Sequence, residues 1–275
     1  MNSEECAVGR HYNDNIFDYE LERLDRHSPV EFGITLRALS RFLPRTTEVA
    51  VDVGVGSGAY SSWLASRGIS VHLIDVSERL LDTTAGRLQR EGLEGRILGR
   101  HHLSATELSA IPDAHADAVL ALGPFYHLRE LDDRRRSVRE AARVLKPGGV
   151  IFAAGVNRLA LLRDAFRDTP ETGARYRDRR LRFLEDGRLD PEVAPPIGFA
   201  YLTTAVEFAD LFVREFDRIA LWGLESFTSP AQEKLAELSK EDREAWLDIV
   251  ERTAALPESL GYSDHFLYVG SCKGG

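Results

Sequence analysis

Short apolar runs alternate with amphipathic stretches along most of the chain. Runs at 49–53, 71–74, 116–122 and 150–154 have the length of strands, and a weaker one lies near 96–102. The stretches between them repeat apolar residues at helical spacing, as in 59–66, 78–90 and 138–145. Strands that alternate with helices need crossover connections, which predicts a mainly parallel sheet with helices on both faces.

The alternation is flanked and interrupted by other patterns. Before it, Ser28-Pro29 followed by Glu31 predicts a capped helix with Glu31 as the capping-box acid. After it, helices are expected near 205–214 and 230–253, with strands near 217–221 and 265–269. Ser229 and Ser239 are the expected caps of the second helical stretch, and Trp246, Ile249, Val250 and Thr253 share one of its faces. Charged, proline-broken sequence with one helical piece near 159–167 separates these parts. We predict an N-terminal helical cap (1–46), a core (47–157), a cap insertion (158–202) and the rest of the core sheet with a helical insertion (203–275).

Composition limits the class of protein. A chain of 275 residues with 43% hydrophobic and 29% charged residues suits one α/β domain with a cap. No apolar run can span a bilayer and no signal peptide is visible, so we expect a cytoplasmic protein without a membrane partner. The net charge of −9 argues against a nucleic-acid partner. The arginine-rich run 175–182 is expected to be a solvated helix face.

A glycine loop at the end of the first core strand carries the main chemical signal. Gly54, Gly56 and Gly58 stand at alternate positions after Asp52, and Asp75 ends the next strand. Glycines allow a tight turn and let a ligand approach the backbone, and a carboxylate at the second strand can accept ribose hydroxyls. Together these residues predict a nucleotide-type cofactor site.

The loop also satisfies the dinucleotide pattern Gly54-x-Gly56-x-x-Ala59, so an NAD-linked oxidoreductase has to be considered. Asp52 opposes this interpretation because its carboxylate would repel a pyrophosphate. It would instead favour a cationic amino group.

Two further motifs identify a family. With Asp117-Ala118-Val119 and Lys146-Pro147-Gly148-Gly149, the loop resembles class I S-adenosylmethionine (SAM)-dependent methyltransferases. The resemblance implies a Rossmann-like seven-stranded sheet of order 3-2-1-4-5-7-6, SAM as cofactor and S-adenosylhomocysteine (SAH) as product. Ser104 stands where the family usually has an acid that contacts the adenine amine. The implied cofactor-binding residues are Arg23, Asp52, Gly54, Gly56, Gly58, Asp75, Ser104, Ala105 and Leu122.

A narrower resemblance concerns the acceptor. Arg23-Leu24-x-Arg26-His27, Glu31-Phe32 and Gly123-Pro124-Phe125-Tyr126-His127-Leu128 are similar to a bacterial subgroup of small-molecule methyltransferases, many from natural-product pathways. Some proteins similar to that subgroup methylate indole carbons. The resemblance implies N-, O- or C-methylation of a small, aromatic or heterocyclic metabolite. Candidate catalytic residues are Tyr12, His27 and His127, and candidate substrate-binding residues are Phe125, Tyr126 and Tyr201.

Methyl transfer from a sulfonium requires alignment in a dry site, so we expect neither a metal nor a covalent nucleophile. A SAM-binding protein that does not methylate, such as a cyclase or scaffold, remains an alternative. The sequence also leaves open whether the chain forms a homodimer.

Overall fold

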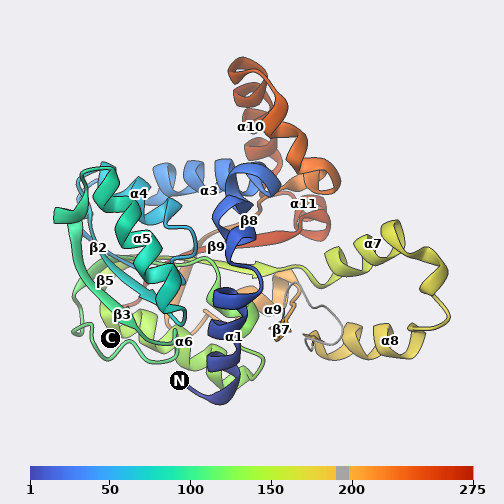
Figure 1. The fold of residues 1–275 in the computed structure, drawn as a ribbon, viewed down its shortest axis with the longest axis horizontal. Coiled ribbons are helices and arrows are strands. Elements are labelled where there is room, and N and C mark those ends of the chain that lie inside the picture. Colours follow the sequence, from blue (N-terminus) through green and yellow to red (C-terminus); the bar gives the residue numbers. More distant parts are fainter. Residues whose placement is uncertain (190–197, 275) are drawn as a thin grey trace.

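The computed structural model describes residues 1–189 and 198–274, and their centre is a seven-stranded sheet (Figure 1). Its strand order is β3-β2-β1-β4-β5-β9-β8, with β9 antiparallel to both of its neighbours. This confirms the predicted order, in which the last strand lies between the fifth and sixth strands of the sheet. The bounds are β1 (Val49–Val53), β2 (Ser70–Asp75), β3 (Ile97–His102), β4 (Ala116–Ala121), β5 (Leu145–Val156), β8 (Phe216–Gly223) and β9 (His265–Cys272).

The central strands are largely apolar because both faces of the sheet are covered. In β4, Ala118 and Leu120 pack toward α3 (Pro29–Phe42), α4 (Ala59–Ser66) and α5 (Glu78–Arg90). Val119 and Ala121 pack on the opposite face, toward α6 (Leu131–Val144) and α9 (Ala205–Asp210). Figure 1 shows α3 and α4 on one side of the strands and α6 on the other. The alternation of the strand therefore fills two separate hydrophobic cores.

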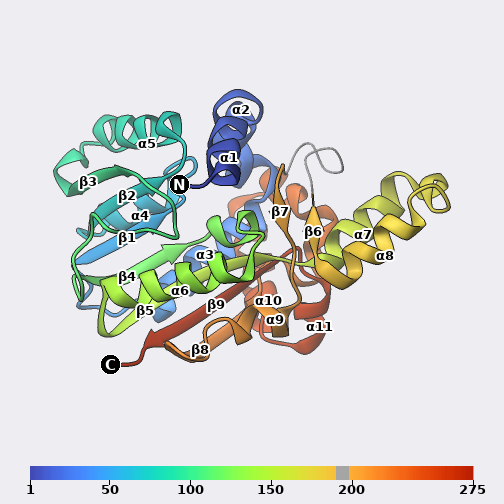
Figure 2. The same ribbon diagram turned by 90° about the horizontal axis from the view of Figure 1, so that it is seen from below.

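The predicted insertion forms an arm beyond the sheet (Figures 1 and 2). It contains α7 (Arg158–Asp168), a short 3-10 turn (Pro170–Thr172) and α8 (Arg177–Asp186), followed by the antiparallel pair β6 (Arg188–Leu189) and β7 (Ala200–Tyr201). We expected one helical piece here, and α8 is a second helix. It buries Phe183 and exposes much of its arginine-rich surface, as a solvated helix does. Residues 190–197 of the insertion lie outside the described residues.

The remaining helices lie near the two ends of the chain. At the N-terminal end, α1 (Ser3–Asp14), α2 (Phe17–Glu22) and a π-helical turn (Arg23–His27) lead into α3. A 3-10 segment (Ser226–Glu237), α10 (Lys240–Thr253) and α11 (Pro257–Tyr262) lie between β8 and β9. Among the described residues, no helix combines the length and the apolar character that crossing a membrane would require.

Two expectations about these helices were wrong. Ser28 precedes α3 but its side chain makes no capping bond, and Glu31 pairs with Arg23 instead of closing a capping box. Ser239 does cap α10, whereas the Ser229 hydroxyl is buried without a partner. The buried face of α10 carries Leu247 and Val250, while Trp246 and Ile249 are each 45% exposed.

The core makes one stability prediction. Leu39 on α3 is fully buried against the sheet, so Leu39→Ala should lower the free energy of unfolding by about 2–5 kcal/mol. The matched control is Leu159→Ala on α7, where the side chain is 51% exposed and the change should stay within about 0.5 kcal/mol. Urea unfolding measures both values. Equal losses in the two variants would contradict the placement of α3.

Candidate functional site

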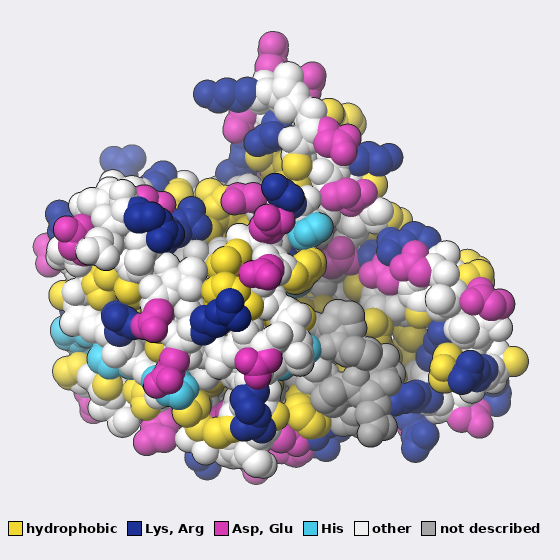
Figure 3. Space-filling model, in the orientation of Figure 1, with side chains coloured by type: hydrophobic (Ala, Val, Ile, Leu, Met, Phe, Trp, Pro, Cys, Tyr) yellow, Lys and Arg dark blue, Asp and Glu magenta, His cyan; other side chains and the backbone are white. Residues whose placement is uncertain are grey.

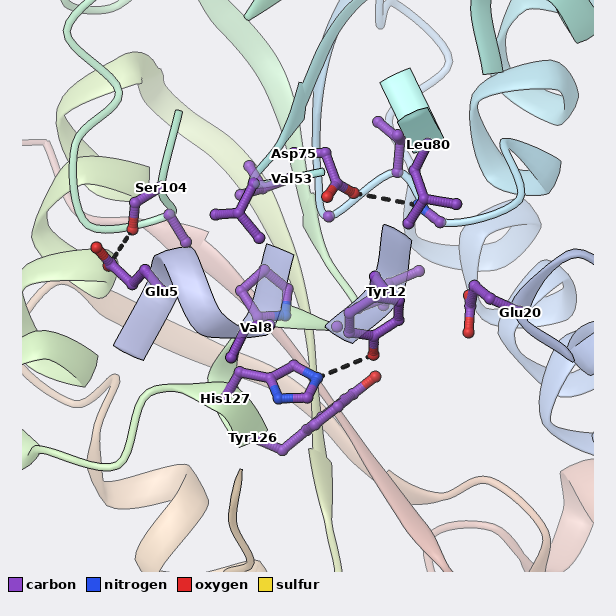
Figure 4. Close-up of a pocket in the computed structure, with 18 of the residues that line it drawn as sticks. Glu5, Val8, Tyr12, Glu20, Val53, Asp75, Leu80, Ser104, Tyr126 and His127 are labelled. Carbon is purple, nitrogen blue, oxygen red and sulfur yellow. Dashed lines mark hydrogen bonds between the residues drawn. The ribbon is translucent and has the colours of Figure 1, made fainter. Parts of the chain in front are cut away.

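A pocket of about 870 Å³ lies where the carboxyl ends of β1, β2 and β4 meet the N-terminal helices (Figure 4). Doubly wound sheets bind ligands at this edge. The glycine loop and Asp75 form one wall, and α1 contributes Glu5, Val8 and Tyr12 from the opposite side. Of the residues expected to bind the cofactor, the pocket is lined by Arg23, Gly54, Gly56, Asp75, Ser104, Ala105 and Leu122.

The backbone of the glycine loop explains its composition. Gly54 and Gly56 have φ values of 79° and 50°, a region that favours glycine. A Cβ on Gly56 would come within 2.6 Å of Glu20 Oε1 in the pocket. Gly58 lies outside the pocket lining, and a Cβ there would meet Thr84 of α5 at 2.8 Å. Gly54 and Gly56 thus form pocket surface, whereas Gly58 allows the loop to pack against α5.

Asp75 ends β2 and faces the pocket. Its Oδ1 accepts a 2.8 Å bond from the backbone N–H of Ser77, and its Oδ2 lies 3.4 Å from the nitrogen of Gly56. Burial raises the pKa of Asp75 to about 6. The carboxylate keeps free lone pairs that a pair of ligand hydroxyls can use.

Asp52 does not reach the pocket. The two-residue period of β1 puts its side chain on the same face as Ala50, under α4, where it accepts a hydrogen bond of 2.5 Å from the Ser61 hydroxyl. Burial raises the pKa of Asp52 to about 7. The structure therefore places this carboxyl group behind the glycine loop, away from the position we predicted for it.

Two acidic residues that sequence reasoning missed, Glu5 and Glu20, line the pocket in place of Asp52. Glu5 of α1 accepts hydrogen bonds from the hydroxyls of Ser104 and Thr106, and Glu20 of α2 faces Gly56 (Figure 4). Both are less than 9% exposed. Glu5 also closes a capping box with Asn2, and Glu20 pairs with Arg23, but these local contacts do not indicate that either carboxylate reaches the pocket.

A second, wider cavity adjoins the first. Tyr12, Glu20, Arg23, Tyr126 and His127 line both of them. The second cavity extends to α7, to the 3-10 segment and to His265 at the start of β9. Two ligands, one in each cavity, would meet at these five residues.

His127 and two tyrosines form a hydrogen-bonded chain at this junction. The Nδ1 of His127 lies 2.9 Å from the carbonyl oxygen of Phe199, so Nδ1 carries the proton that is donated. Nε2 then accepts from the Tyr12 hydroxyl at 2.9 Å, and Tyr12 also bonds with Tyr126. Burial lowers the pKa of His127 to about 4, which leaves the ring neutral at pH 7.

Beneath the junction lies a buried charge network of Glu20, Arg23, Glu31, Glu225 and His265. Arg23 contacts Glu31 at 2.6 Å and Glu20 at 3.3 Å, and the His265 Nδ1 lies 2.7 Å from Glu225 and 3.7 Å from Glu31. Burial alone would lower the pKa of His265, but the Glu31 and Glu225 carboxylates raise it to about 9. Within the described residues, Glu31, Glu225 and His265 also have metal-ligand spacing. A protonated His265 and Arg23 already pair these carboxylates.

The other predicted site residues lie away from the junction. His27 is exposed at the rim of the second cavity and stacks on Tyr19, with ring centroids 5.0 Å apart. Phe125 lines neither cavity; its ring packs in the core against Phe208 and Phe212. Tyr201 also lines neither cavity and lies under the Arg134 guanidinium at 3.5 Å. The structure gives Phe125 and Tyr201 packing roles in place of the substrate contacts that we expected.

Comparison with known proteins finds a methyltransferase domain in the core. Residues 51–153 match the family described as a methyltransferase domain. The chain is 35% identical over 121 residues to ribosomal RNA small subunit methyltransferase C of Alcanivorax borkumensis, covering 42% of this chain and 35% of that protein. It is 33% identical over 108 residues to a ubiquinone biosynthesis O-methyltransferase of Caulobacter vibrioides, covering 39% and 40%.

Residues 51–153 thus carry a methyltransferase domain, and the comparisons support a class I SAM-dependent methyltransferase with SAM as the methyl donor. This favours SAM over the NAD-linked alternative. The matches to the two relatives above span about two fifths of those proteins or less.

Solved methyltransferase folds resemble the whole chain. A chain from the complex with the Haloferax volcanii Trm112 methyltransferase activator has a TM-score of 0.62 at 17% identity, covering 98% of both chains. The [4+2]-cyclase SpnF has a TM-score of 0.58 at 16% identity, covering 98% and 97%. N-methyltransferase NodS of Bradyrhizobium japonicum with bound SAH has a TM-score of 0.57 at 12% identity, covering 98% and 99%. At these identities the likeness concerns the fold alone.

The charge network makes a prediction about pH. The pKa of His265 in the folded protein lies above its ordinary value of about 6.5. Its contribution to stability should therefore be fully present below about pH 6.5 and disappear as the pH rises through 9, with a size of up to about 3 kcal/mol. An NMR titration of the ring measures the pKa directly, and unfolding of wild type and His265→Gln at pH 6 and pH 9.5 measures the stability.

Glu225→Gln should lower the pKa of His265, because one of the two carboxylates that raise it is gone. If the ring in the wild-type protein instead titrates at or below its ordinary value, the charge network as described here is wrong.

Proposed function

We propose that this chain transfers a methyl group from SAM to a small acceptor molecule held in the second cavity. The observation that carries the proposal is the junction: Tyr12, Tyr126 and His127 line the donor pocket and the adjoining cavity together. A methyl donor and an acceptor need contact in line and without water between them. Two cavities that meet at a buried junction meet this requirement.

The donor pocket suits SAM in its chemistry. Asp75 offers free carboxylate lone pairs for the ribose hydroxyls, and Gly54 and Gly56 present bare backbone. Ala105 and Leu122 supply apolar surface for the adenine beside Ser104. Arg23 lies where the two cavities join and can pair with a ligand carboxylate. SAM, when bound, supplies an electrophilic methyl group.

The residues of the junction position the acceptor. His127 is held in one tautomer by the Phe199 carbonyl and fixes the direction of the Tyr12 hydroxyl. With a pKa near 4, His127 is a weak base, so its role is to orient Tyr12. Helix α1 covers the pocket and excludes water. Catalysis then rests on alignment, which can lower the barrier by a large amount in reactions of this kind.

The second cavity favours a small aromatic or heterocyclic acceptor. Tyr12, Tyr19 and Tyr126 provide flat apolar surface, and Arg163 and Asp264, which pair with each other, stand at the far wall. Such a cavity accommodates a ring with a polar substituent, methylated on nitrogen, oxygen or carbon, including an indole carbon. A long polyanion fits poorly, because this face mixes acidic and basic side chains (Figure 3) and the net charge is −9.

A screen of acceptors with SAM tests the proposal. Purified protein is incubated with sets of indoles, phenols, amines and carboxylated heterocycles, and mass spectrometry detects the gain of one CH₂ unit together with SAH formation. Methylation of at least one ring compound is expected. Tight SAH binding without a methylated product from any of these sets would favour the alternative of a SAM-binding protein that does not methylate.

Asp75 carries the prediction for the donor site. Asp75→Ala should weaken SAM binding by about 1.5–3 kcal/mol, because ribose hydroxyls lose a charged acceptor. In wild type, affinity should fall as the pH drops through about 6, where this carboxyl group becomes protonated. Calorimetry measures both effects, and Asp82→Ala on the exposed side of α5 is the control. Unchanged affinity in a folded Asp75→Ala variant would remove Asp75 from the site.

A further inference from the structure

The core of this methyltransferase leaves two polar groups of SAM without a partner. SAM carries a cationic α-ammonium group at one end and an adenine amine at the other. Buried donors of this kind need acceptors. Asp52 is turned toward Ser61, and the hydroxyl of Ser104 donates its hydrogen to Glu5. Asp52 therefore offers no carboxylate to the pocket, and Ser104 supplies no acid for the adenine amine.

We infer that the N-terminal helices supply both acceptors, with Glu20 binding the α-ammonium group and Glu5 the adenine amine. The inference rests on the proposed use of SAM. It assigns to residues outside the matched domain 51–153 the recognition of the two ends of the donor. Within the described residues, the carboxylates that line the donor pocket are those of Glu5, Glu20 and Asp75. Asp75 is assigned to the ribose in the middle of the donor, which leaves Glu5 and Glu20 for its two ends.

The position of Glu20 carries the first half of the inference. Its Oε1 lies 2.6 Å from the point that a Cβ on Gly56 would occupy, so this oxygen faces the glycine loop, while Oε2 pairs with Arg23. In the network around it, three carboxyl groups (Glu20, Glu31 and Glu225) meet two cationic groups (Arg23 and His265). An ammonium group at Oε1 would balance the remaining carboxylate.

The position of Glu5 carries the second half. Its Oε1 accepts from the hydroxyls of Ser104 and Thr106, the latter at 3.0 Å, and Oε2 accepts from the backbone N–H of Asn2 at 2.6 Å. Three donors hold the carboxylate in place and leave lone-pair capacity for one more. Ala105, which also lines the pocket, lies between Ser104 and Thr106 in the chain. An adenine against Ala105 would therefore present its amine to Glu5.

Close packing of α1 keeps the Glu5 carboxylate in the site. A Cβ on Gly9 would lie 2.4 Å from the carbonyl oxygen of Val76, so only glycine allows this approach. Asn13 at the other end of α1 accepts hydrogen bonds from the Ser77 hydroxyl and from Arg79, both at 2.6 Å. Helix α1 is thus attached to the residues that follow Asp75.

Three ligands separate the two roles by calorimetry on the full chain. SAH carries both groups, 5′-methylthioadenosine lacks the amino-acid part, and S-inosylhomocysteine has an oxo group in place of the adenine amine. Glu20→Gln should weaken SAH binding by about tenfold or more and leave methylthioadenosine within about twofold. Glu5→Gln should weaken SAH and methylthioadenosine alike and reduce the preference for SAH over S-inosylhomocysteine by about fivefold or more.

The matched control is Glu22→Gln, an exposed carboxylate on α2 that should change none of these affinities. Ratios between ligands within one variant cancel any loss of folded protein. Glu20→Gln that weakens SAH and methylthioadenosine equally, or neither, would overturn the first assignment, and Glu5→Gln with an unchanged SAH preference would overturn the second. If the variants change the ligand affinities as expected but the wild-type protein methylates no acceptor, the proposed function is contradicted and this inference stands.

Discussion

A guanidinium group removed from water must be surrounded by acceptors, and the way in which Arg23 meets this constraint organises the site. Arg23 contacts Glu20 of α2 and Glu31 of α3. Glu31 also faces His265 at the start of β9, which bonds to Glu225. One buried cation therefore ties the N-terminal helices to the last strand of the sheet. Without it, two carboxylates under the junction of the cavities would lack their partner.

The two cavities follow from this attachment. Because α1 and α2 lie across the carboxyl edge of the sheet, Tyr12 reaches His127, which follows β4. The donor pocket is closed from above by α1, and the second cavity opens on the side of α7. In the proposed function, catalysis rests on alignment and exclusion of water. Its junction contains a neutral histidine and two tyrosines in place of a strong base.

The mainly parallel sheet and the glycine loop could be predicted because they depend on local patterns: strand-length apolar runs, crossover helices and glycines before a helix. The strand order came from the family resemblance that these patterns carry. The role of Asp52 could not be predicted in the same way. The motif suggested that its carboxylate faces the ligand, but the alternation of side chains along β1 turns it toward Ser61 of α4. Glu31 fits a capping box in sequence, but a buried arginine eight residues earlier takes its carboxylate. Glu5 and Ser104 are 99 residues apart, and no spacing rule connects them. The parts of the site that the sequence left out are those made by side-chain contacts between different elements, some of them far apart in the chain.

The account stands on the claim that the N-terminal helices form part of the donor site. A crystal structure of the protein with SAH bound tests this most directly. The account predicts the ribose hydroxyls on Asp75, the ammonium group on Glu20 and the adenine amine on Glu5, with α1 in place over the ligand. An SAH molecule whose ammonium group contacts Asp52, or that binds with α1 displaced from the pocket, would contradict it.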